Sequence, residues 1–153
     1  MNQNDVINYI ASAYDGTDIV CASDNYFFFY NPASSPEPDR RLPFATLVTR
    51  DEYDLAFQLT HPSIYRLSIG VGQATYRELF GPPPKGDGSE VADTGHDYTA
   101  LDELMPHPIY APMAWVCVLS PGETTFEVVK PLLAGAYTRA VRRYQTRTNR
   151  GAS

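Results

Sequence analysis

The chain has 153 residues, 43% of them hydrophobic, and its formal net charge is −6. This length fits a single domain, and the apolar content excludes wholesale disorder. No apolar run is long enough to span a membrane, the MNQNDVINYI segment lacks the pattern of a signal peptide, and the acidic balance argues against generic nucleic-acid binding. We therefore expect a cytoplasmic location.

The chain begins with a predicted helix. Apolar residues recur at helical spacing between Val6 and Tyr14, Asn4 is the expected N-cap, and the Asp15-Gly16 pair ends the helix. Two β-like runs follow, the second of which is YFFFY. Because only a short turn signal at Asp24-Asn25 separates them, they are expected to form a hairpin, at residues 17–22 and 26–30.

The middle of the chain alternates loops with regular elements. The patterns predict a loop, a strand, a short segment of helical character, a strand, a helix and a long loop, at residues 31–42, 43–50, 51–57, 63–71, 73–80 and 81–98. Clusters of proline and glycine mark both loops. Long loops inside compact domains are often mobile or bind ligands.

The C-terminal part predicts a last strand at residues 111–119 and a helix at 124–144. Pro131 lies inside that helical pattern, so either the helix kinks there or two helices meet. We expect an α+β fold: a mostly antiparallel, twisted sheet of about five strands with the N- and C-terminal helices packed on one face. Residues 1–146 would form a single domain and residues 147–153 a disordered tail.

Two predicted strands are apolar on both faces, which points to a covered second sheet face. The YFFFY run and the last strand lack the alternation of a half-solvated strand. In residues 63–71, by contrast, Arg66 and Ser68 alternate with Tyr65 and Leu67, so they should lie on the face opposite the helices. Arg66 among aromatic rings is either a surface residue with a packed stem or an anchor for an anion.

Histidines supply the candidates for acid–base chemistry. His107 is held between two prolines just before the last strand, so its ring either points into the second face near Trp115 or caps a turn. The long loop carries His96 beside Asp97, which suggests an acid–base pair or a solvated loop. We predict catalytic roles for His107, Asp97 and Tyr30, and ligand contacts for a further set: Arg66, Trp115, Tyr26, Phe28, Tyr110 and Ser68.

Several chemistries lack their motifs. Neither the cysteines nor the histidines have the spacing of metal ligands, and no phosphate-binding glycine loop, dinucleotide fingerprint or nucleophile elbow is present. We therefore expect no metal and no cofactor. Cys21 and Cys117 lie in apolar stretches, which favours buried and inert thiols. The last 24 residues hold six basic residues and no acidic one. Basic side chains of this kind complement a helix C-terminus, and the alternative is that they bind phosphates or nucleic acid.

Four segments together resemble an uncharacterised bacterial family, domain-of-unknown-function family 6194. In chain order they are residues 27–30, PFATLVTRD at 43–51, YRLSIGV at 65–71 and HPIYAPMAWVCVLSP at 107–121. The chain is more distantly similar to the MmcQ/YjbR-like proteins. The resemblance implies an α+β sheet backed by helices and transfers no catalytic residue.

Three functions compete on this reading. The first is a domain that binds a small aromatic or anionic molecule, including a cofactor-independent acid–base enzyme that cyclises or condenses an aromatic, biosynthetic-type substrate. The second is a non-enzymatic module for homodimerisation or protein interaction. The third is a nucleic-acid-associated regulator, which rests on fold analogy alone and which the acidic body opposes.

Overall fold

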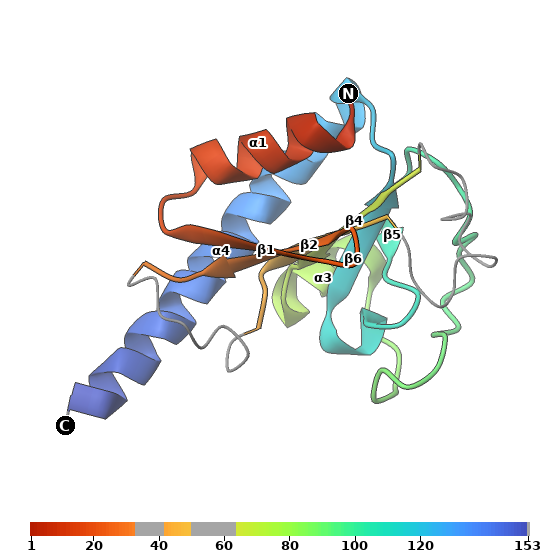
Figure 1. Ribbon diagram of the computed structural model, residues 1–153. Coiled ribbons are helices and arrows are strands. Elements are labelled where there is room, and N and C mark those ends of the chain that lie inside the picture. Colours follow the sequence, from red (N-terminus) through yellow and green to blue (C-terminus); the bar gives the residue numbers. More distant parts are fainter. Residues whose placement is uncertain (33–41, 50–63, 153) are drawn as a thin grey trace.

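The structure, a computed structural model, describes residues 1–32, 42–49 and 64–152. Its elements in chain order are α1 Gln3–Ala13, β1 Thr17–Ala22, β2 Asn25–Tyr30, β3 Ala45–Val48, β4 Arg66–Gly70, α3 Gln73–Phe80, β5 Met105–Pro106, the 3₁₀ turn η2 Ala111–Met113, β6 Trp115–Leu119 and α4 Glu123–Ala152. The strands form one sheet in the order β1-β2-β3-β4-β6-β5, and every neighbouring pair is antiparallel. The expected α+β architecture is confirmed (Figure 1).

Local signals account for the first elements. Helix α1 is capped by Asn2, not by Asn4 as expected, because Asn2 and Asp5 bond reciprocally: the Asn2 side chain accepts from the Asp5 N–H at 3.0 Å, and Asp5 accepts from the Asn2 N–H at 2.8 Å. The hairpin is confirmed, with its turn one residue earlier than predicted. Ser23 and Asp24 have φ values of 52° and 65°, as two-residue hairpin turns require.

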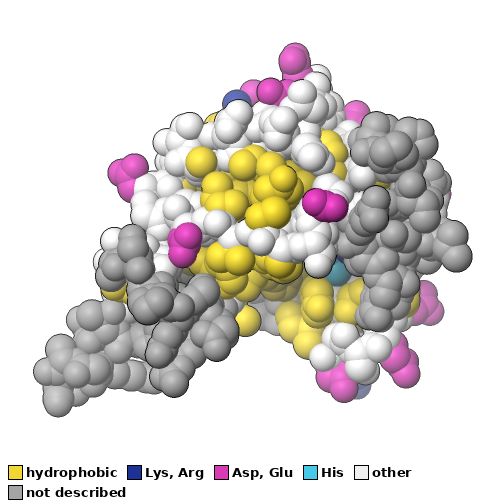
Figure 2. All heavy atoms as spheres, in the orientation of Figure 1, with side chains coloured by type: hydrophobic (Ala, Val, Ile, Leu, Met, Phe, Trp, Pro, Cys, Tyr) yellow, Lys and Arg dark blue, Asp and Glu magenta, His cyan; other side chains and the backbone are white. Residues whose placement is uncertain are grey.

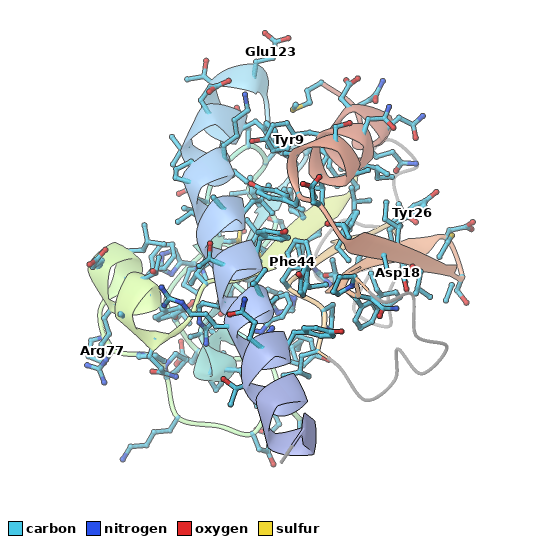
Figure 3. The ribbon with its side chains drawn as sticks, turned by 90° about the vertical axis from the view of Figure 1, so that its left-hand side faces the viewer. Tyr9, Asp18, Tyr26, Phe44, Arg77 and Glu123 are labelled. Carbon is cyan, nitrogen blue, oxygen red and sulfur yellow. The ribbon has the colours of Figure 1, made fainter. Side chains whose placement is uncertain are left out.

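One face of the sheet packs against α1 and α4. One apolar side of α4 is buried on this face, as are alternate residues of the strands: Phe126, Val129, Leu133, Ala136 and Ala140, with Phe28, Ala45, Leu47, Leu67, Ile69, Val116 and Val118. Figure 3 shows α4 running across the sheet, with the rings of Tyr9 and Phe44 lying beside it. A single helix passes through Pro131. We call this the helix face.

Three details of the C-terminal half differ from the prediction. Strand β6 begins at Trp115 instead of residue 111, because a 3₁₀ turn precedes it and Ala114 takes a left-handed conformation with φ 64°. The sheet gains a sixth strand, β5, whose two residues are too few for a pattern. Helix α4 continues to Ala152, into the segment 147–153; the disorder expected there stays a prediction.

Two further expectations concern Cys21 and residues 51–57. Cys21 is exposed, not buried, because β1 is an edge strand of the sheet. The helical character predicted for residues 51–57 lies outside the described residues.

Candidate functional site

The second sheet face carries a buried polar row. Along β4, Arg66 and Ser68 alternate with the helix-facing Leu67 and Ile69, so they point to the opposite side, as predicted. Ser68 pairs with Cys117 on β6. The exposed fractions are 4% for Arg66, 1% for Ser68 and 1% for Cys117, so this face is covered and not solvated. We call it the Arg66 face.

His107 lies at the end of this row, just after β5. Met105 pairs with Cys117, and the backbone N–H of His107 donates to the carbonyl of Trp115 at 3.0 Å. Strand alternation therefore puts the His107 side chain on the same face as Cys117. The ring is 3% exposed. Its Nδ1 accepts two backbone N–H groups, those of Ile109 and Tyr110, each at 3.0 Å.

The sequence left open whether His107 points into the second face or caps a turn. The structure shows that it does both. Pro106 and Pro108 fix the backbone on either side of it, and Nδ1 closes the turn that follows. The imidazole is thus held by the chain around it.

Burial and one cation set the electrostatics of this face. Burial lowers the pKa of His107 well below its usual range, and the nearby Arg66 guanidinium lowers it further, so the ring is neutral. Burial raises the pKa of the Cys117 thiol to about 12, an effect that Arg66 only partly offsets. The Arg66 charge therefore acts on both groups.

The Ser68 hydroxyl has no hydrogen-bond partner among the residues that the structure describes, although its oxygen is buried. Most buried polar atoms in native proteins are paired, and leaving one unpaired costs about 1–3 kcal/mol. This hydroxyl lies two residues from Arg66 on the same face of β4. The arrangement leaves a donor and acceptor group unused next to a buried guanidinium.

Two of the predicted ligand contacts lie around this cluster. Trp115 is half-buried on β6, and its ring covers Gly70 so closely that a Cβ added to Gly70 would approach it to 2.9 Å. Tyr110 is 49% exposed, and its ring lies 4.9 Å from that of His107. Both side chains therefore flank the polar row, one packed and one open.

Three other predicted residues are on the wrong side of the sheet. Tyr26, Phe28 and Tyr30 share the helix face: Tyr26 pairs with the core residue Leu47, and Phe28 is fully buried in the core. The Tyr30 ring packs edge-on against two tyrosines of α4, Tyr137 at 5.6 Å and Tyr144 at 5.4 Å. Alternation makes Phe27 and Phe29 the aromatic residues of β2 on the Arg66 face.

The His96–Asp97 pair is not formed. The Asp97 carboxylate is exposed and accepts from the Thr99 backbone N–H at 3.0 Å and from the Thr99 hydroxyl at 2.6 Å. These two bonds lower the pKa of Asp97. His96 instead contacts Thr94, and its ring packs edge-on against Phe80 at 5.4 Å. Asp97 thus stabilises a turn and is not part of the cluster around His107.

Sequence reasoning did not select Cys117 and Tyr98 for this site. Cys117 lies in an apolar run of the sequence, which predicted only that its thiol is buried. Tyr98 packs against the small apolar cluster of Ile64 and Leu119. Burial raises the pKa of the Tyr98 hydroxyl, and the nearby Cys117 also raises it. No local sequence pattern predicts that a tyrosine in a loop packs against a strand that comes later in the chain.

The long loop is attached to the His107 turn. The Ala92 N–H donates to the Pro108 carbonyl at 2.6 Å, and the Tyr98 hydroxyl donates to the Ala92 carbonyl. Gly88 packs so closely on Met113 that a Cβ there would meet it at 3.1 Å. A hollow of about 510 Å³ lies within this loop, between residues 85–93 and Pro112.

The parts of the chain that the structure describes hold no group of three or more histidine, cysteine or acidic residues able to bind a metal ion. Within the same ranges, no helix is both long and apolar enough to cross a membrane.

On the face shown in Figure 2, hydrophobic side chains gather near the middle of the view and acidic ones are scattered around the rim.

Comparison with known proteins gives a family and no activity. The model of a family described as "Family of unknown function (DUF6194)" matches residues 1–149. Searches of the curated proteins and of the solved structures found no significant match. The geometry of the Arg66 face therefore has to carry the functional argument.

Proposed function

Because the chain belongs to the DUF6194 family, whose function is unknown, we propose a function from its own geometry: it binds a small molecule through an anionic oxygen group, a carboxylate or a phosphate, on the Arg66 face. The observation that carries this proposal is the buried Ser68 hydroxyl, which has no partner within the described ranges of the chain and lies two residues from the buried Arg66 guanidinium. Guanidinium groups match the planar geometry of these anions.

The surroundings favour a ligand that also has an apolar, aromatic part. Phe27 lies on the Arg66 face of β2, and it pairs with Thr46, which in turn pairs with Ser68. Trp115 flanks the row on β6. Charge–charge attraction is stronger where protein surrounds the charges than in water, so Arg66 can hold an anion here more tightly than an exposed arginine could.

This proposal concerns binding and departs from general acid–base catalysis. Of the three residues predicted to be catalytic, Asp97 stabilises an exposed turn and Tyr30 packs on the helix face. Only His107 belongs to the cluster. Cyclisation or condensation of an aromatic substrate would need a proton acceptor, and neither Asp97 nor Tyr30 lies where it could serve.

The test is a titration of ¹⁵N-labelled protein followed by its amide signals. We expect benzoate or inorganic phosphate to give saturable shifts at Ser68, Cys117 and His107, and we expect benzamide, the neutral isostere of benzoate, to give none. In Ser68→Ala these shifts should weaken. The proposal is overturned if neither anion shifts these residues, or if benzamide acts as benzoate does.

The other hypotheses have weaker support. Half-buried apolar residues near the β1 edge, Ile19 and Val20, favour a second candidate, a homodimer or protein-interaction surface. A monomer by light scattering at all concentrations would exclude the homodimer. Nucleic-acid association rests on the distant similarity to MmcQ/YjbR-like proteins and remains a proposal that the net charge of −6 opposes.

A further inference from the structure

We infer that His107 meets the bound ligand as a neutral Nε2–H donor, so that the site offers hydrogen-bond donors to an oxyanion and contains no base at this position. This inference rests on the proposed anion binding and deepens it. It starts from the bonding of the ring, which does not depend on any ligand.

The tautomer follows from the hydrogen bonds of Nδ1. This atom accepts the N–H groups of Ile109 and Tyr110, each at 3.0 Å, so it presents its lone pair to them. A neutral imidazole with an accepting Nδ1 carries its proton on Nε2. A proton on Nδ1 would face two N–H donors and would break the turn.

The turn itself resists rearrangement. The His107 N–H is bonded to the Trp115 carbonyl at 3.0 Å, and the His107 carbonyl accepts from the Ala111 N–H at 3.2 Å. Two prolines flank the residue, and Ala92 bonds to Pro108. Rotating the ring to free Nδ1 would leave the backbone N–H groups of Ile109 and Tyr110 unpaired while this backbone stays fixed.

The groups around the ring also keep it from gaining a second proton. The Arg66 guanidinium of β4 and the protonated Cys117 thiol of β6 lie on the same face, and the Tyr110 ring lies 4.9 Å away. Among the described neighbours, none supplies a carboxylate that would stabilise an imidazolium. His107 is then neither a base, because its free nitrogen carries a proton, nor a strong acid, because it is neutral.

The consequence is that the polar side chains of this site can all act as hydrogen-bond donors. Arg66 offers only donors, Nε2 of His107 offers a donor, and the Ser68 hydroxyl can donate its proton as well. Donors fixed in a buried site stabilise an oxygen that bears, or develops, negative charge. The ligand class is therefore a carboxylate, a phosphate or an enolate oxygen, and an ammonium group is rejected.

The test combines one spectroscopic and one binding measurement. Two-dimensional ¹H–¹⁵N spectra of the histidine rings, with the His107 signals assigned by their loss in His107→Gln, should show a protonated Nε2 and an unprotonated Nδ1 between pH 8 and pH 5. On addition of benzoate or inorganic phosphate, the Nε2 signal should shift while Nδ1 stays unprotonated. An Nδ1–H tautomer, or an imidazolium in that pH range, overturns the inference.

A matched pair of variants separates the two sides of the ring. In His107→Asn the amide oxygen can still accept the turn's N–H groups, but nothing reaches the ligand, so affinity for benzoate or phosphate should fall by about tenfold or more. In His107→Gln the amide N–H₂ can reach the position of Nε2, so more affinity should remain. Equal loss in both variants, with both folded, contradicts the donor role. If neither anion binds a protein that shows the expected tautomer, the proposed function is overturned instead.

Discussion

Replacing Ser68 by alanine should stabilise this protein. The side chain is 1% exposed and its hydroxyl has no hydrogen-bond partner among the described residues. A buried hydroxyl of this kind costs about 1–3 kcal/mol, and alanine removes it while leaving a gap of only one atom. We expect the free energy of unfolding to rise by about 1 kcal/mol, which for a chain of this size raises Tm by about 2–4 °C.

Ser120→Ala provides the matched control. The Ser120 hydroxyl accepts from the Tyr65 backbone N–H at 3.3 Å, so its loss leaves a donor unpaired and should lower stability by about 1 kcal/mol. Urea unfolding of the two variants beside the parent chain measures both effects. If Ser68→Ala loses as much stability as Ser120→Ala, the hydroxyl has a structural partner and the reasoning for a site on this face is refuted.

Three further predictions concern the core, the cysteines and the long loop. Leu133→Ala should cost about 2–5 kcal/mol, because the Leu133 side chain of α4 is fully buried in the core. Val128→Ala, at a 54% exposed position of the same helix, should cost under about 0.5 kcal/mol, and equal effects in urea would show that α4 does not cover the core. A thiol reagent should modify Cys21 at once and Cys117 only on unfolding, because Cys117 is buried and its pKa is raised to about 12. Rapid reaction of two thiols in the native protein, or of any thiol in native Cys21→Ser, would contradict this. Limited proteolysis should cut first within residues 82–95, because this segment has three glycines with positive φ and no helix or strand. Strong protection there without a ligand would contradict this and would show that the contacts of Ala92 and Gly88 keep the loop ordered.

Local periodicity predicted a large part of this fold. The helix at residues 73–80 was predicted with the bounds that the structure has, because glycines flank a short helical pattern. The face of Arg66 followed from the two-residue period of β4 alone. These features depend only on neighbours in the chain.

The candidate site was predicted less well, because it depends on register and burial. The YFFFY run indicated aromatic rings on both faces, but only the pairing of β2 with β3 decides that Phe27, and not Phe28, lies beside Thr46 and the Ser68 row. The depth of Arg66 depends on what covers the face, which strand patterns do not encode. Asp97 is different: the Asp-x-Thr spacing from Asp97 to Thr99 is a turn signal, and it would have identified the carboxylate as structural.

Burial also changes how the site should be probed. A surface Arg66 or His107 could be truncated to alanine with little change in Tm. At 4% and 3% exposure, both side chains are part of the packing, so alanine variants would mix lost stability with lost binding. Arg66→Lys keeps the charge and removes only the planar donor geometry, so it separates the two effects better.

The most direct test of the central claim is the affinity of the parent chain and Arg66→Lys for benzoate, measured by the shift of the Ser68 amide signal with benzamide as the neutral reference. The account predicts saturable binding of benzoate alone, at Ser68 and His107, weakened in Arg66→Lys because the ammonium cannot form paired bonds to the carboxylate. Binding of equal strength in the two proteins, or shifts that avoid the Arg66 face, would contradict it.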